Sequence, residues 1–168
     1  IKSTSQRISM INILFVCTAN RFRSVIAAAT LHALAVKDGT AAGWKITSAG
    51  TWTVDGLPPV PEAVKFAEQH RLDISGHCSR EVTKPILESS DIIIVMTEGQ
   101  RESLELEFGQ QQGKVHLFSE VFTGETYDIP DPFENPEDAP ESVGVEIYNL
   151  VTAGYPRLAG IVQKIGTV

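Results

Sequence analysis

The sequence predicts a single-domain α/β protein whose doubly wound sheet has four parallel strands, in the order 2-1-3-4, flanked by helices. Two observations predict this class. Short apolar runs recur along the chain, as expected for parallel strands buried on both faces, and helical stretches separate each run from the next. Because strand, helix and strand alternate, the helices serve as crossovers between parallel strands. The ligand crevice of such a sheet lies at the carboxyl ends of its strands.

Four strands are expected, each a short apolar run. They span residues 11–16, 44–47, 92–95 and 115–118.

The helices between these runs carry recognisable start and stop signals. The first spans residues 25–36 and ends before Gly39, and the second begins at Pro61 and ends near residue 70. Glycine favours the end of a helix and proline its first turn, so each of these two boundaries carries a residue type that suits it.

The remaining helices are predicted in the same way. A short helix begins at Thr83, and Thr97 with Gln100 forms a capping box for a helix through residue 108. The last helix runs from about residue 140 to residue 153. Gly154 and Pro156 are expected to break or kink it there, because proline lacks a backbone N–H and clashes with the preceding turn.

The length fits one domain. A chain of 168 residues buries about 70% of the surface that it exposes when unfolded. Its polar start lacks the apolar stretch of a signal peptide, and Met10 heads the first strand. We expect residues 1–9 to be an N-terminal extension or a cloning remnant, and residues 10–168 to form the domain.

Charge and cysteine content limit the partners and the compartment. A net charge of −7 argues against nucleic acid and against an anionic membrane as the main partner. The 2 cysteines cannot build a disulfide framework, and no apolar run approaches the roughly 20 residues of a membrane span, so a cytoplasmic location is expected. No cluster of residues has metal-ligand spacing, and we expect neither a metal nor another cofactor.

Cys17 and Arg23 bracket the loop that joins the first strand to the first helix. Backbone N–H groups of such a loop converge on an anion, and the helix macrodipole adds partial positive charge. A thiol placed there is favoured as the thiolate, and a guanidinium grips two phosphoryl oxygens at once. We therefore predict a phosphate-binding loop with Cys17 as nucleophile and Arg23 as clamp; the alternative for Cys17 is a small buried hydrophobe. The residues between them are candidates for substrate binding: Thr18, Ala19, Asn20, Arg21 and Phe22.

Several motifs resemble those of the low-molecular-weight protein tyrosine phosphatases. The loop signature of that family is C, two residues, N, two residues, R and then S or T, and it is matched by Cys17, Asn20, Arg23 and Ser24. Residues 48–51 resemble the family's S-A-G-T stretch, residues 77–80 its H-x-A-R element and residues 91–96 its third strand. Residues 131–133 match its D-P-aromatic loop. The resemblance covers residue 10 to about residue 162 and implies a metal-independent phosphomonoesterase.

The resemblance and the chemistry of phosphoryl transfer together suggest further roles. Ser24 can donate a hydrogen bond to the thiolate and also act as N-cap of the helix. Asn20 tolerates a left-handed backbone, and its amide can pin the loop. The leaving oxygen needs a proton from a carboxylic acid on a mobile loop, and we assign this role to Asp131. There are two alternatives: Asp128 is the acid, or Asp131 only forms a turn before the proline.

Three more residues are expected beside the loop. By the resemblance, His77 braces Asn20 and the loop from behind, as a supporting residue rather than a catalytic one. Phe133 could form a wall for the ring of the substrate. Trp52 follows the S-A-G-T stretch, where it either forms another rim of the cleft or simply packs.

Two loop residues depart from the family pattern. Many members carry a second cysteine where Phe22 stands, a backup thiol that traps an oxidised nucleophile as a disulfide, and this chain lacks it. Arg21 occupies a usually apolar or small position whose side chain helps to choose the substrate. A second guanidinium there either favours acidic substrates or points to water.

The expected function is hydrolysis of phosphotyrosine in proteins or peptides through a phosphocysteine intermediate, with phosphate-like anions as further ligands. The nearest alternative is a protein-arginine phosphatase of the same family. An arsenate reductase would need two more cysteines near Asp91, whereas only Cys78 lies near it. A phosphate-binding module without turnover is a third alternative, which the combination of Cys17, Arg23 and Asp131 disfavours.

Overall fold

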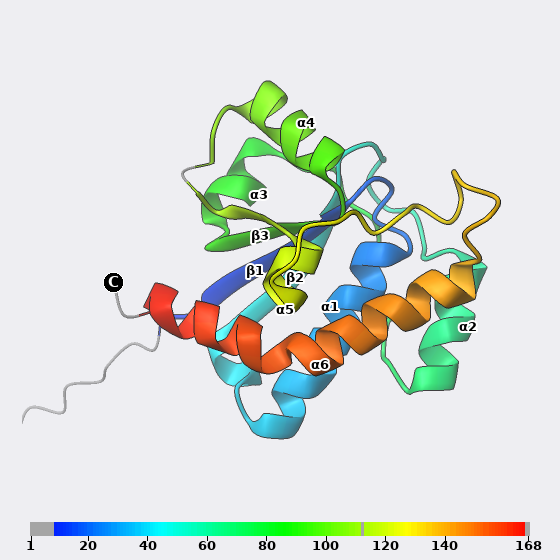
Figure 1. Cartoon of the computed structure of the whole chain (residues 1–168), viewed down its shortest axis with the longest axis horizontal. Coiled ribbons are helices and arrows are strands. Elements are labelled where there is room, and N and C mark those ends of the chain that lie inside the picture. Colours follow the sequence, from blue (N-terminus) through cyan, green and yellow to red (C-terminus); the bar gives the residue numbers. More distant parts are fainter. Residues whose placement is uncertain (1–8, 112, 167–168) are drawn as a thin grey trace, which may run out of the picture.

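The sheet of this protein has four parallel strands, in the order β2-β1-β3-β4 (Figure 1). The computed structural model describes residues 9–111 and 113–166. The strands are β1 (Ile11–Cys17), β2 (Trp44–Gly50), β3 (Ile92–Val95) and β4 (Val115–Leu117). The predicted α/β class and strand order are confirmed. The expected N-terminal extension lies outside the described residues, apart from Ser9.

Helices cover both faces of the sheet. They are α1 (Arg23–Asp38), η1 (Ala41–Gly43, a 3₁₀ turn), α2 (Pro61–His70), α3 (Lys84–Ser89), α4 (Glu98–Phe108), α5 (Phe118–Thr123) and α6 (Pro140–Gly166). Side chains alternate along β1, so Ile13 and Phe15 join one core with α1, α5 and α6, while Leu14 and Val16 join a second core. Figure 1 shows α3 and α4 over that second face. Burial on both faces explains why β1 is a continuous apolar run.

The last helix continues past the point where a break was expected. α6 runs without interruption to Gly166 with Pro156 inside it, so the predicted end near residue 153 is wrong. A proline inside a helix costs about 3 kcal/mol. Leu158 and Val162 lie beyond the proline and are 0% and 4% exposed, and burying such side chains is worth about 1.5–3 kcal/mol each. Tertiary packing therefore outweighs the local preference.

Close contact with α5 also holds this part of α6 in place. A Cβ atom at Gly154 would lie 2.7 Å from the Cα atom of Phe122, so only glycine allows the two helices to approach this closely. The same region holds a second difference from the predicted elements, because β4 ends at Leu117 and Phe118 begins α5. Six residues give too few turns for a helical period to stand out in the sequence.

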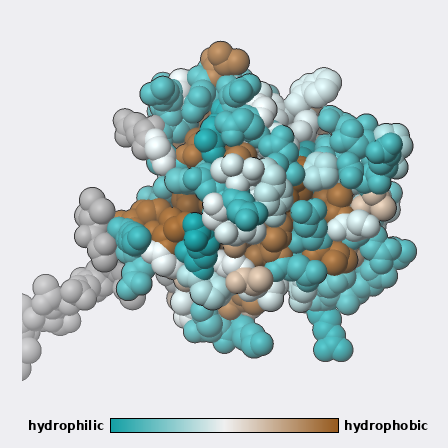
Figure 2. Space-filling view, in the orientation of Figure 1, coloured by the Kyte–Doolittle hydropathy of each residue, from teal (hydrophilic) through white to brown (hydrophobic). Residues whose placement is uncertain are grey.

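Hydrophilic side chains cover most of the face drawn in Figure 2, with hydrophobic atoms visible between them. Among the residues that the structure describes, no helix is long and apolar enough to cross a membrane.

The carboxyl ends of the parallel strands meet at one edge of the sheet, where the loops after them gather. The loop after β1 connects directly to α1, and the segment between α5 and α6 crosses the same edge. There the backbone N–H of Ile129 donates to the carbonyl oxygen of Met96 at 2.9 Å, which ties this segment to the end of β3. The edge therefore brings together residues that are far apart in the sequence.

Candidate active site

The predicted nucleophile lies at the N-terminus of a helix. Cys17 is the last residue of β1, Arg23 is the first residue of α1, and the thiol is 2% exposed. The backbone N–H of Asn20 donates to the sulfur at 3.3 Å, and the Ser24 hydroxyl oxygen lies 3.1 Å from it. The sulfur therefore lies beside two polar groups and at the positive end of the α1 macrodipole.

Asn20 fixes the shape of the loop. Its backbone has a φ of 56°, in the left-handed region that asparagine tolerates better than most residues. Its side-chain N–H groups donate to the hydroxyl oxygens of Ser24 and Ser48, both at 2.9 Å, and its Oδ1 accepts from the Arg80 backbone N–H at 3.0 Å. The predicted left-handed backbone and pinning role of this residue are therefore observed.

These contacts also orient the Ser24 hydroxyl. Because the Asn20 amide donates to the Ser24 oxygen, the hydroxyl proton is available to point toward the Cys17 sulfur. The other predicted role of Ser24 is wrong. The N-cap of α1 is Phe22, which makes no side-chain capping bond, and Ser24 lies inside the first turn of the helix.

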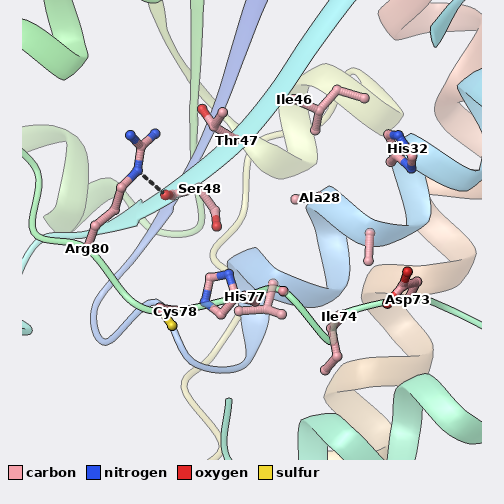
Figure 3. A pocket seen from close by; sticks show the side chains of 13 residues that line it. Ala28, His32, Ile46, Thr47, Ser48, Asp73, Ile74, His77, Cys78 and Arg80 are labelled. Carbon is pink, nitrogen blue, oxygen red and sulfur yellow. Dashed lines mark hydrogen bonds between the residues drawn. The ribbon is translucent and has the colours of Figure 1, made fainter. Parts of the chain in front are cut away.

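His77 supports the loop from behind, as the resemblance implied. Its Nε2 atom lies 2.8 Å from the carbonyl oxygen of Asn20, and because a carbonyl only accepts, this nitrogen carries the proton. His77 also lines a cavity of about 370 Å³ on that side (Figure 3). At the edge of this cavity the Arg80 side chain donates from Nε to the Ser48 carbonyl at 2.9 Å. Burial lowers the pKa of Arg80, and the charge of Asp55 opposes this shift.

Arg23 brings the loop into contact with the predicted general acid. The side chain of Arg23 is 3% exposed, and its Nη1 donates to the carbonyl oxygen of Ile129 at 2.9 Å. Its Nη2 lies 3.0 Å from Oδ2 of Asp131 and 3.3 Å from the Thr18 hydroxyl oxygen. The side chain of Asp131 is 15% exposed, so this ion pair is largely shielded from solvent.

The two candidate acids occupy different places. Asp131 also accepts the backbone N–H of Phe133 at 3.0 Å through Oδ1, which fixes the carboxylate at the start of its turn. Asp128 instead accepts the backbone N–H of Glu98 at 2.9 Å, at the N-terminus of α4. Only Asp131 lines the same cavity as Cys17.

This cavity has a volume of about 300 Å³ and opens between the loop and the segment that carries Asp131. It is lined by Cys17, Ala19, Arg21, Phe22, Arg23, Val60, Asp131 and Phe133. The rings of Phe22 and Phe133 meet edge to face, with centroids 5.4 Å apart at 83°. The side chain of Arg21 donates from Nε to the carbonyl oxygen of Pro58 at 2.7 Å, so its guanidinium is tethered beside the cavity.

Trp52 adjoins the loop through its backbone rather than its ring. Its N–H donates to the carbonyl oxygen of Thr18 at 3.0 Å, while its side chain is 82% exposed and does not line the cavity. The approach of the two segments depends on Gly50, where a Cβ atom would lie 2.6 Å from the Thr18 carbonyl oxygen. Contact between the Trp52 ring and a substrate stays a prediction.

Three residues of the site were not predicted from the sequence to belong to it. Val60 forms part of the cavity wall, Ser48 receives the Asn20 amide, and Gln100 donates from Nε2 to the Thr18 hydroxyl oxygen at 3.2 Å. Ser48 belongs to the S-A-G-T stretch, and this motif could have identified it as a residue of the site. The capping box revealed Gln100 as a helix-start residue but gave no indication of its contact with the loop.

No group of three or more His, Cys, Asp or Glu side chains that could hold a metal ion occurs in the part of the chain that the structure describes.

Comparison with known proteins identifies the family. The family model for low molecular weight phosphotyrosine protein phosphatases matches residues 12–164. The chain is 31% identical over 149 residues to the probable low molecular weight protein-tyrosine-phosphatase EpsP of Ralstonia solanacearum, covering 89% of this chain and 97% of that protein. It is 29% identical over 140 residues to a protein-arginine-phosphatase of Bacillus subtilis, covering 83% and 91%.

Solved structures agree with these sequence matches. A mutant of the arginine phosphatase YwlE with a phosphorylated active-site serine superposes with a TM-score of 0.79 at 27% identity, covering 92% of this chain and 97% of that one. The fold, the order of the motifs and the sequence matches thus agree over nearly the whole described chain, and the protein is a member of the low molecular weight phosphotyrosine protein phosphatase family, whose enzymes are cysteine-dependent hydrolases.

Proposed function

We propose that this phosphatase hydrolyses phosphotyrosine in proteins through a phosphocysteine intermediate, and that residues 10–168 form its catalytic domain. Cys17 is the nucleophile, Arg23 the clamp and Asp131 the general acid. The observation that carries the proposal is the meeting of these three side chains in one cavity, although Asp131 lies 108 residues beyond Arg23 in the chain. A thiolate, a cationic fork and a carboxyl group are the groups that this reaction needs.

In the first step the Cys17 sulfur attacks the phosphorus atom and the bond from phosphorus to the tyrosyl oxygen breaks. The loop N–H groups and Arg23 hold the charge on the equatorial oxygens. Asp131 gives its proton to the leaving phenolate oxygen. The Ser24 hydroxyl, 3.1 Å from the sulfur, stabilises the thiolate before attack and again when it leaves.

In the second step water attacks the phosphocysteine. Asp131, now a carboxylate, accepts a proton from that water, the bond from phosphorus to sulfur breaks, and inorganic phosphate and the thiolate are regenerated. The phosphorylated active-site serine in the YwlE mutant supports a covalent phosphoenzyme in a related site.

The residues that line the cavity favour phosphotyrosine over phosphoarginine as the substrate. Phe22 and Phe133 present aromatic faces and edges to a substrate ring. The side chain of Arg21 is held at the cavity by its hydrogen bond to Pro58, and its positive charge would oppose the cationic guanidinium of a phosphoarginine. The same charge would attract acidic residues beside a phosphotyrosine.

Arsenate reduction is less well supported. That reaction needs further thiols to pass a disulfide along. The chain holds only Cys17, which is buried, and Cys78, which is exposed, and Cys78 does not line the catalytic cavity. We also propose a cytoplasmic location, which the low cysteine content supports.

The test compares matched phosphotyrosine, phosphoarginine and phosphoserine peptides with acidic or neutral flanks. The phosphotyrosine peptide with acidic flanks is expected to give the highest kcat/KM. In Arg21→Ala the ratio of kcat/KM between peptides with acidic and with neutral flanks is expected to be smaller than in the wild type. Lys84→Ala, which removes a charge paired with Glu88 on α3, serves as the control for a general change of charge. Faster turnover of phosphoarginine than of phosphotyrosine would contradict the proposed substrate.

A further inference from the structure

We propose that Gln100 is a positioning residue for Arg23, acting through the hydroxyl group of Thr18. The inference rests on the proposed function only in that Arg23 is taken to hold the phosphoryl group. Gln100 lies on α4, behind the loop, and its side chain is 5% exposed. A polar side chain that is buried so completely is kept only where its hydrogen bonds are made.

The orientation of the Gln100 amide is fixed by the backbone. Its Oε1 accepts the N–H groups of Met96 at 2.9 Å and Thr97 at 3.1 Å, at the end of β3. Two N–H donors require an oxygen, so the amide has one possible orientation. Its Nε2 therefore faces the loop and donates to the Thr18 hydroxyl oxygen at 3.2 Å.

Thr18 connects this amide to the clamp. Its hydroxyl oxygen accepts from Gln100 and also from Nη2 of Arg23, at 3.3 Å. An amide N–H and a guanidinium N–H can only donate, so both lone pairs of the hydroxyl oxygen are occupied. With Gln100 in place, the Thr18 oxygen stays aimed at Arg23.

This contact is needed because the other partner of Nη2 changes during the reaction. Asp131 lies 3.0 Å from the same Nη2 atom, but as the general acid it must carry a proton before it donates it. A protonated carboxyl group is neutral and a weaker acceptor than a carboxylate. The neutral chain of Gln100 and Thr18 holds the guanidinium at its place in every protonation state of Asp131.

The experiment measures turnover and anion binding separately. Gln100→Met keeps the length of the side chain and removes both the cap and the donor to Thr18. Thr18→Val removes only the shared oxygen, and Thr18→Ser restores it. Thr97→Ala is the matched control, because it removes the other half of the capping box and leaves the Gln100 side chain in place. Steady-state kcat/KM, the Kd for inorganic phosphate and Tm are measured for all variants.

Loss of the partly buried hydrogen bond between Gln100 and the Thr18 oxygen predicts a fall of about 3- to 10-fold in kcat/KM and in phosphate affinity for Gln100→Met and for Thr18→Val. Thr18→Ser is expected to restore most of the phosphate affinity that Thr18→Val loses, and Thr97→Ala is expected to lower Tm without changing phosphate affinity. Because the two residues act in one chain, the double variant of Gln100→Met with Thr18→Val is expected to lose no more than Thr18→Val alone.

Two results would overturn the inference. One is a phosphate affinity of Gln100→Met equal to that of Thr97→Ala, and the other is a double variant whose losses are the product of the single losses. If Gln100→Met does not fold, Thr18→Val with normal phosphate affinity refutes the chain by itself, and a loss restored by Thr18→Ser supports it. If the wild type does not hydrolyse phosphopeptides, the proposed function fails, whereas the phosphate-binding measurements still decide the role of Gln100.

Discussion

Replacing Asn20 by alanine is expected to cost about 4 kcal/mol of stability. The side chain is fully buried and makes three hydrogen bonds, to Ser24, Ser48 and the Arg80 backbone, each worth about 1 kcal/mol. Alanine must also adopt the left-handed φ of 56°, at a further cost of about 1 kcal/mol. Since domains are stable by about 5–15 kcal/mol, the variant folds with a Tm lower by about 8–16 °C.

The matched variant Asn20→Gly separates the two contributions. Glycine loses the same three hydrogen bonds but adopts the left-handed backbone without strain. At ordinary positions glycine is less stable than alanine by about 0.5–1 kcal/mol, whereas here it is expected to be the more stable of the two by up to about 1 kcal/mol. Urea unfolding of both variants measures the difference. A glycine variant that is less stable than the alanine variant would refute the argument from backbone strain.

The remaining predictions concern chemistry and pH. Cys17→Ser is expected to abolish hydrolysis of p-nitrophenyl phosphate while phosphate or vanadate still binds, and measurable turnover would exclude the thiolate mechanism. Asp131→Asn is expected to lower kcat by about 10²- to 10⁴-fold, and Asp128→Asn is expected to lower it far less. A larger loss for Asp128→Asn would identify Asp128, and not Asp131, as the general acid. After peroxide treatment, reductant is expected to restore little activity, because no resolving thiol lines the cavity beside Cys17. Full recovery with a Cys17–Cys78 disulfide in mass spectra would contradict this. Burial, and then the charge of Asp138, raise the pKa of Glu146, so its contribution to stability is present below the ordinary glutamate pKa and is lost as the pH rises through the raised value. Glu146→Gln is therefore expected to raise Tm at about pH 7 but not at about pH 3, and an equal effect at both values would exclude ionisation as the cause.

The loop between β1 and α1 could be predicted from the sequence because its determinants are local. Cys17 and Arg23 are joined by one short loop between a strand and a helix, and each boundary has its own signal. Asp131 is remote in sequence, and only the resemblance to a known family linked it to the loop. The brace from His77 was likewise implied by the resemblance, and the structure places its Nε2 atom at the Asn20 carbonyl.

Features that depend on tertiary packing could not be predicted in this way. Pro156 and Gly154 are helix breakers by local preference, but burial of α6 against α5 outweighs that preference. Gln100 was recognised as part of a capping box, while its second contact requires the end of β3 and the loop after β1 to lie side by side. The N-cap role expected for Ser24 was wrong because the helix begins at Arg23, two residues before the predicted start.

The anchoring of Ile129 limits how far the segment that carries Asp131 can move. Its side chain is fully buried, its N–H donates to the carbonyl oxygen of Met96 and its carbonyl oxygen accepts from Arg23, so the backbone two residues before Asp131 is fixed at the end of β3 and at the start of α1. In many enzymes that close a lid over the substrate, opening of the lid limits turnover. Here Asp131 and Arg23 are already in contact without a substrate, so we expect any motion of Asp131 to be confined to the residues after Ile129 and no lid opening to limit turnover.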